Sequence, residues 1–408
     1  MILANGKIYD TSRQDEVLDG LEAALNRTLA EKTLRPEQVI AAIDRLGRRL
    51  DGGEFDHLLS QVDQAERYLA QIRPQLTRQA LEYKLRVELG TDTAPYVTTP
   101  PAGLPALTVR PAPLGVLLHI AAGNVDGLPA YSVVEGLLTG NINLLKLPQA
   151  DSGLSIEILR YLMEEEPTLA DFLYVFDTPS EDVDALLRMA KLSDGVVVWG
   201  GDGAVSAVRR FAPPGVKLIE WGHRLSFSYL SGAQDRERDW PALARHIIET
   251  RQLLCSSCQV IYLDTHSQED VHTFCRNFLP LLEQAVTQGP ARSLSVAAEQ
   301  ALRRYQIRIE RAISGQASTD ERTVYDGAGC SLTACTDREL ELSDLFGNPL
   351  VKALPREELL PVLRRQKGRL QTAGLLCPEG DRAALTDLLV RAGVTRVLPA
   401  GEMSDSFC

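Results

Sequence analysis

The amino-acid sequence predicts an α/β fold made of two α/β parts, with a helical segment ahead of the first. Short β-rich runs alternate with helical stretches after residue 115, which is typical of parallel strands joined by crossover helices. A second α/β stretch begins near Leu225. A chain of 408 residues is also long enough to build two or three separate cores.

Residues 1–90 are expected to be mostly helical. The short run Ile2–Tyr9 contains the turn dipeptide Asn5-Gly6. Beyond it, apolar residues recur at helical spacing, at Val39, Ile43, Leu46, Leu50, Phe55, Leu58, Val62, Leu69 and Ile72. Charged residues fill the other faces, so these helices must pack against something, and glycines at 47, 52 and 53 disfavour a coiled coil.

Residues 91–113 are expected to form an extended connector or arm, because six prolines in this stretch are incompatible with a helix. The first α/β part then follows, with strands predicted at Val116–Ile120, Ile142–Leu147 and Val196–Trp199 and helices at Leu128–Leu138, Leu154–Glu164 and Val183–Lys191. In the second part a strand is predicted at Gln259–Leu263, and helices at Asp239–Thr250, Gln268–Gln288, Ser293–Ile313, Arg356–Gln366 and Asp381–Ala392.

Composition narrows the class of protein. The net charge of −12 disfavours a nucleic-acid partner, and the basic cluster Arg364–Arg369 is interpreted as the solvated end of a helix. No apolar run is long enough to span a membrane, and the N-terminus lacks the pattern of a signal peptide. Seven cysteines are too few for a disulfide scaffold. We therefore expect a soluble cytoplasmic protein with reduced thiols.

A glycine-rich turn follows the apolar strand that ends at Trp199. Gly200 and Gly201 precede a helical stretch, and this arrangement suits a phosphate because backbone N–H groups and the helix N-terminus favour an anion. The segment is neither a complete G-x-G-x-x-G motif nor a P-loop. A tight turn without a ligand is an equally good interpretation.

Two polar residues stand at strand or helix ends. Asn124 follows a buried strand, where its amide can stabilise an oxyanion, although an Asx-turn residue is the simpler interpretation. Cys255 lies between a helix and a strand, a partly exposed position that suits a nucleophile. The alternatives for Cys255 are a buried structural cysteine, a redox pair with Cys258, and a zinc site that includes Cys258, Cys330 and Cys335.

His119 lies in an apolar strand and is interpreted as a core histidine.

Taken together, these segments resemble the aldehyde dehydrogenase superfamily, and within it the acyl-CoA reductase (LuxC) branch. The resemblance implies an aldehyde dehydrogenase-like fold in which 1–224 bind the cofactor, 225–400 carry the catalytic cysteine and 401–408 form a tail. It assigns Cys255 as the nucleophile, with Gln252 as a shifted form of the family's glutamine, and Asn124 as an oxyanion donor.

The resemblance also implies a nicotinamide site and no metal. Lys146 matches a lysine near the adenosine ribose, Gly200 and Gly201 match the pyrophosphate loop, and Asp344 and Phe346 match the segment that contacts the nicotinamide ribose, although the family has glutamate at the first of these. Gln149 stands where members that prefer NAD often carry a glutamate. We therefore expect NADPH, with NADH as the alternative.

The implied reaction is reduction of an acyl thioester to an aldehyde through an acyl-Cys255 intermediate. Glu220 matches the glutamate that oxidising members use to activate water, and here it either assists proton transfer or is a structural, ion-paired residue. The implied partners are an acyl-CoA or acyl-carrier thioester, an acyl-transferring enzyme and further copies of the chain. An oxidising or CoA-acylating aldehyde dehydrogenase, and a non-catalytic scaffold or thiol sensor that uses Cys255 and Cys258, are the competing hypotheses.

Overall fold

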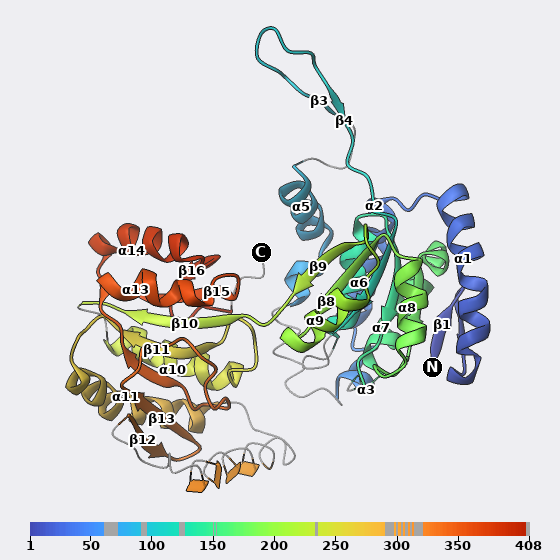
Figure 1. The fold of residues 1–408 in the computed structure, drawn as a ribbon. Coiled ribbons are helices and arrows are strands. Elements are labelled where there is room, and N and C mark those ends of the chain that lie inside the picture. The colour runs from blue at the N-terminus through green and yellow to red at the C-terminus, as the bar shows by residue number, and fades with distance from the viewer. Residues whose placement is uncertain are drawn as a thin grey trace. The chain divides into compact units, whose positions relative to one another are not determined.

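The chain divides into two compact units, residues 1–222 and 223–408 (Figure 1). The computed structural model describes all residues except 61–71, 91–95, 122–126, 150, 152, 233–235, 290–297, 299–300, 303–304, 307–308, 311, 314–320 and 405–408. The division falls after Gly222, whereas the sequence analysis set it after residue 224.

Unit 1 is built on a sheet with the strand order β2-β1-β7-β6-β5-β8-β9. Its strands are β1 (Ile2–Ala4), β2 (Lys7–Tyr9), β5 (Val116–Ile120), β6 (Ile142–Lys146), β7 (Leu173–Phe176), β8 (Gly195–Trp199) and β9 (Lys217–Trp221). From β7 to β9 all neighbours are parallel, while β1 and β2 form an antiparallel hairpin. Asn5 and Gly6 turn this hairpin with φ of 50° and 69°, as the dipeptide predicted.

The parallel strands alternate with crossover helices, which confirms the predicted alternation. These helices are α6 (Leu128–Leu138), α7 (Leu154–Glu165), α8 (Val183–Lys191) and α9 (Asp202–Phe211). Strands β5 to β8 are apolar along nearly their whole length because helices cover both faces of the sheet. The chain runs from β5 towards β7, then returns to place β8 on the other side of β5. Ligands of such sheets bind where the strand order reverses, at the carboxyl ends of the strands.

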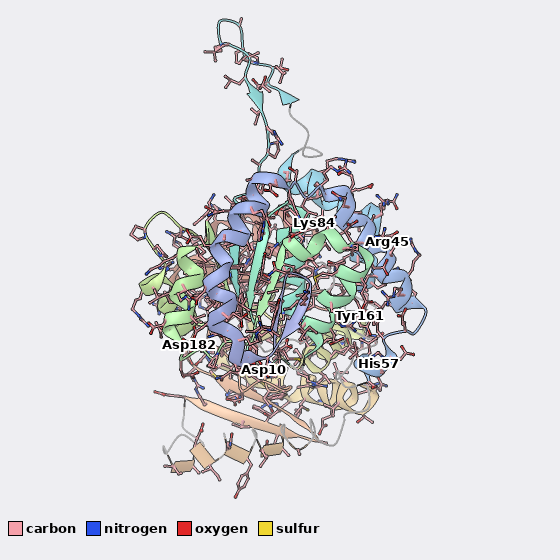
Figure 2. All side chains as sticks on the ribbon, turned by 90° about the vertical axis from the view of Figure 1, so that its right-hand side faces the viewer. Asp10, Arg45, His57, Lys84, Tyr161 and Asp182 are labelled. Carbon is pink, nitrogen blue, oxygen red and sulfur yellow. The ribbon has the colours of Figure 1, made fainter. Side chains whose placement is uncertain are left out.

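The N-terminal helices pack onto this unit through their apolar stripes. They are α1 (Gln14–Glu31), α2 (Pro36–Asp51), α3 (Asp56–Leu59) and α5 (Arg78–Leu89), with short 3-10 turns at Thr11–Arg13, Arg73–Leu76 and Pro167–Asp171. Val39 and Ile43 of α2 are buried in the same core as the strands. Ion pairs fix the outer faces: Lys84 of α5 bonds Glu135 of α6, and Arg45 of α2 bonds Glu165 of α7 at 2.8 Å (Figure 2).

The proline-rich segment forms an arm, as expected. Within the described residues, β3 (Tyr96–Val97) pairs with β4 (Thr108–Val109) in a hairpin that belongs to neither large sheet. Figure 1 shows this hairpin standing away from the helices and sheet of unit 1.

Unit 2 contains a sheet with the order β12-β13-β14-β11-β10-β15-β16, parallel except for the β12–β13 hairpin. Its strands are β10 (Leu225–Leu230), β11 (Cys258–Leu263), β12 (Arg322–Gly327), β13 (Cys330–Cys335), β14 (Leu350–Ala353), β15 (Leu370–Leu376) and β16 (Arg396–Leu398). Helices α10 (Arg236–Thr250) and α11 (Gln268–Gln288) cover one face, and α13 (Arg356–Leu363) and α14 (Glu379–Ala392) cover the other (Figure 1).

Three smaller points concern the predicted helix 293–313, the basic cluster and membrane spans. The predicted helix 293–313 lies largely outside the described residues. Arg364 and Arg365 are exposed in a 3-10 turn, Arg364–Gln366, at the end of α13, as interpreted. Among the helices that the structure describes, none has the length and apolar character of a membrane span.

Candidate functional site

The candidate residues of unit 1 gather along one edge of its sheet. Lys146 ends β6, Gly200 and Gly201 follow β8, and Glu220 is the penultimate residue of β9. Asn124, which follows β5, lies outside the described residues. The carboxyl ends of β6, β8 and β9 therefore carry four of the predicted residues at the edge where the strand order reverses.

Lys146 presents a buried cation at this edge. Its side chain is 4% exposed, and its Nζ donates a hydrogen bond of 2.9 Å to Ser180 Oγ. Burial lowers the pKa of Lys146, while the nearby carboxylates of Glu181 and Asp177 favour its charged form. Gln149 is exposed, and its Nε2 lies 3.4 Å from Oε2 of Glu181. A carboxylate thus stands beside both residues predicted to meet the adenosine ribose.

The glycine turn can accept a phosphate. Gly201 is the N-cap of α9 and makes no side-chain capping bond, and a Cβ at this position would meet no atom within 4 Å. There is therefore space for an anion beside Gly201 at the N-terminus of α9, whereas the N–H of Gly200 already donates to the carbonyl of Trp221 at 3.2 Å. Asp202, in the first turn of α9, adds an acidic side chain that a phosphate would have to avoid. With the buried lysine at β6, these residues fit a nicotinamide dinucleotide.

Glu220 is ion-paired. Nε and Nη2 of Arg209 each donate a bond of 2.6 Å to its carboxylate, and these bonds hold the pKa of Glu220 below its ordinary value. Next to it, Trp221 stacks on Trp199 with ring centroids 5.0 Å apart. Glu220 is therefore a carboxylate at neutral pH, which is the ion-paired interpretation that the sequence left open.

Cys255 lies in the loop that joins α10 to β11 in unit 2, and it is exposed. Its carbonyl accepts a hydrogen bond of 2.6 Å from Ser226 Oγ, and Ser226 Oγ in turn accepts from the backbone N–H of Thr372. Because Ser226 and Thr372 belong to β10 and β15, these bonds fasten the backbone of Cys255 to the sheet.

A second loop meets the cysteine loop. Phe346 N–H donates to the carbonyl of Arg251 at 2.8 Å, which joins the segment 343–348 to the start of the cysteine loop. Left-handed backbone occurs on both sides, with φ of 51° at Arg251, 60° at Gln252, 61° at Leu345 and 52° at Phe346. Such angles cost non-glycine residues about 1–3 kcal/mol each and persist only where surrounding contacts enforce them. Asp344 and Phe346 are both half-buried in this second loop.

Three other described cysteines, Cys258, Cys275 and Cys335, are poor candidates for a nucleophile. Burial raises the pKa of Cys258 and Cys275 to about 12 and that of Cys335 to about 11. Cys258 is fully buried, and its Sγ lies 3.4 Å from the carbonyl oxygen of Val260. In the part of the chain that the structure describes, no three His, Cys, Asp or Glu side chains are grouped to hold a metal ion.

Several neighbours of the candidate residues were not identified from the sequence. Ser226, Arg209, Ser180 and Glu181 contact the candidates or their immediate partners across gaps of 11 to 34 residues. The run Asp177–Glu181 offered one usable signal, because polar residues directly after a buried strand lie at the same sheet edge as Lys146.

Solved structures that are similar to this chain include dehydrogenases that act on aldehydes. An NADP-dependent glyceraldehyde-3-phosphate dehydrogenase from Bacillus halodurans C-125 aligns with a TM-score of 0.71 at 14% identity, over 98% of this chain and 90% of that one. An NAD-dependent benzaldehyde dehydrogenase from Corynebacterium glutamicum aligns with a TM-score of 0.63 at 15% identity, over 98% and 89%. These similarities confirm the predicted fold.

Curated relatives are similar over a shorter stretch. The long-chain acyl-protein thioester reductase of Aliivibrio fischeri is 26% identical over 157 residues, which are 38% of this chain and 33% of the relative. That of Vibrio harveyi is 26% identical over 165 residues, 40% of this chain and 35% of the relative. The chain thus matches about a third of the length of these relatives. A sequence model of the family "Acyl-CoA reductase (LuxC)" matches residues 32–407. The chain therefore belongs to the acyl-CoA reductase (LuxC) family.

Proposed function

We propose that this protein reduces an acyl thioester to the aldehyde, with NADPH as reductant and Cys255 as the nucleophile. The observation that carries the proposal is an exposed thiol on a loop fastened to the sheet, in a member of the acyl-CoA reductase family. Cys258, Cys275 and Cys335 have raised pKa values and are buried, so they are poorly suited to the same role.

In the first step, the Cys255 thiolate attacks the thioester carbonyl carbon. A new carbon–sulfur bond forms, the bond to the donor sulfur breaks, and the departing thiolate takes up a proton. Exchange between two thiols of similar pKa is close to thermoneutral, so no ATP is needed. The backbone N–H of Cys255 and the amide of Asn124 are the proposed oxyanion donors, each worth about 3–4 kcal/mol in such sites.

A nicotinamide cofactor held in this site would supply a hydride to the carbonyl carbon of the enzyme thioester. The carbon–sulfur bond to Cys255 then breaks, which releases the aldehyde and restores the Cys255 thiolate. Lys146 and Gln149 are the proposed contacts to the adenosine ribose, Gly200 and Gly201 to the pyrophosphate, and Asp344 and Phe346 to the nicotinamide ribose. The Lys146 ammonium supports NADPH, because a 2′-phosphate would gain a charge-assisted bond there. Glu220 is proposed as a charged residue that can accept a proton but, ionised by Arg209, cannot donate one.

The acyl donor is proposed as a thioester of CoA or of a carrier or partner protein. The relatives' names specify acyl-protein thioesters, which favours an acyl-transferring protein partner. Further copies of this chain are proposed as the other partner.

The decisive experiment is acylation without cofactor. The protein is incubated with a long-chain acyl-CoA, and intact mass with peptide mapping is expected to show one acyl group on Cys255. Cys255→Ala should lose both the adduct and acyl-dependent NADPH oxidation, while the matched control Cys258→Ala should retain both. NADPH oxidation that survives in Cys255→Ala would contradict the mechanism.

The same preparation tests the competing activities. Aldehyde-dependent reduction of NADP⁺ or NAD⁺ that is faster than the reductive direction would favour an oxidising enzyme. A reversible Cys255–Cys258 disulfide without any acyl adduct would favour the thiol sensor.

A further inference from the structure

We propose that Gln252 is a positioning residue that couples the nucleophile loop, residues 251–257, to the cofactor loop, residues 343–348. The inference rests on the proposed function, in which Cys255 lies on the first loop and Asp344 and Phe346 on the second. Gln252 contacts no reacting atom in this proposal and acts only through the two loops.

The Gln252 side chain uses its whole hydrogen-bonding capacity on the cofactor loop and on Cys258, the first residue of β11. Its Nε2 donates to the carbonyl of Cys258 and to Ser343 Oγ, both at 2.8 Å. Its Oε1 accepts from the backbone N–H groups of Gly347 and Asn348, at 3.1 and 2.9 Å. The side chain is 1% exposed, so water cannot replace these partners.

A second buried amide supports the first. Gln259 Nε2 donates to the carbonyl of Gln252 at 2.8 Å, and its Oε1 accepts from Ser343 Oγ at 2.7 Å. Asn348 closes the cofactor loop on itself by donating to the carbonyl of Leu345 at 2.6 Å. Gln252, Gln259, Ser343 and Asn348 are all buried, and they form one connected polar cluster under both loops.

The hydrogen bonds of this cluster hold the strained backbone of the two loops in place. Each loop holds two consecutive non-glycine residues in left-handed backbone. Gln252 belongs to the first pair, and its side chain bonds the two residues that follow the second pair. Without its amide, the carbonyl of Cys258 and the N–H of Gly347 each lose a hydrogen bond, and the N–H of Asn348 keeps only its bond of 3.2 Å to the carbonyl of Leu345, so both loops are expected to relax. A displacement of about 1 Å can cost on the order of 100-fold in rate. Loss of Gln252 should therefore impair the thiol and the cofactor contact together.

The test separates positioning from folding. Gln252→Met keeps the length of the side chain but makes no hydrogen bonds. The matched control, Tyr262→Phe, removes one buried bond, from Tyr262 Oη to the carbonyl of Arg338, in the same sheet but in neither loop. For each variant, circular dichroism confirms folding, the cofactor-free acylation rate of Cys255 is measured by mass spectrometry, and NADPH affinity is measured by fluorescence titration.

Gln252→Met is expected to slow acylation by about 10–100-fold and to weaken NADPH binding at a temperature where it is fully folded, while Tyr262→Phe changes neither. Acylation within twofold of wild type, an unchanged NADPH affinity, or equal losses in Tyr262→Phe would overturn the inference. A wild-type protein that is never acylated would instead overturn the proposed function.

Discussion

Among single residues, Lys146 and Glu181 decide which cofactor the proposed site prefers. A buried ammonium attracts a 2′-phosphate, and an adjacent carboxylate repels it but can accept bonds from unmodified ribose hydroxyls. The lysine is the stronger influence, because it is 4% exposed whereas Glu181 is exposed to water that screens its charge.

Substitution of either residue should shift the ratio of NADPH to NADH use. Lys146→Ala is expected to raise KM for NADPH by about 10-fold or more and to change KM for NADH little, because a charge-assisted bond is worth about 1.5–3 kcal/mol. Glu181→Gln should raise kcat/KM for NADPH by about 2–5-fold. Asp184→Asn removes an equal charge in the first turn of α8 and is the control. Equal effects on both cofactors in steady-state assays would count against the assignment.

The sequence predicts a candidate residue when its role depends only on its neighbours in the chain. A cysteine between a helix and a strand, and a glycine pair after a strand, can be recognised within a few positions. Ser226 and Arg209 were not predictable in this way, because their importance depends on pairing across 29 and 11 residues. Gln252 was noticed only by resemblance, and its partners in the 343–348 loop emerge only from the fold.

At the scale of the elements, β5 contains a histidine that must remain neutral. His119 is 1% exposed, with Nδ1 2.8 Å from Ser132 Oγ and Nε2 2.9 Å from Asn143 Oδ1. Burial lowers its pKa from 6.5 to about 4. The interpretation of His119 as a core histidine is thus confirmed. The limits of β5, α6 and β6 were predicted closely, because the apolar runs of buried elements end abruptly at turns.

This histidine should make unit 1 less stable in mild acid. The unfolded chain binds a proton below pH 6.5, whereas the folded chain does not until about pH 4, so stability is full above pH 6.5 and falls towards pH 4. The loss between pH 7 and pH 5 is expected to be about 2 kcal/mol. Urea unfolding should show a smaller loss in His119→Gln, while His57→Gln, an exposed histidine of the same unit, should match wild type (Figure 2). An unchanged pH slope in His119→Gln would contradict the assignment.

At the scale of the whole molecule, contacts within one chain do not account for the arm. Its two-stranded hairpin belongs to neither large sheet, and isolated hairpins of this kind are marginally stable in water. The arm also exposes apolar side chains, with Val97 64%, Leu104 63% and Leu107 60% exposed. Composition predicted an extended segment here, because prolines exclude a helix, but it could not say what covers these side chains.

We propose that a second copy of the chain buries the apolar side chains of the arm. Substitution of these side chains tests this proposal. Val97→Ser, Leu104→Ser and Leu107→Ser combined should shift the protein to a smaller assembly in size-exclusion chromatography with light scattering, because burial of this apolar surface would no longer favour association. The control is Tyr83→Ser with Val87→Ser on α5, where similar apolar area is exposed outside the arm. That control should keep the wild-type mass. An arm variant with the wild-type mass, or a wild-type protein that is already monomeric, would show that copies of this chain do not associate through the arm.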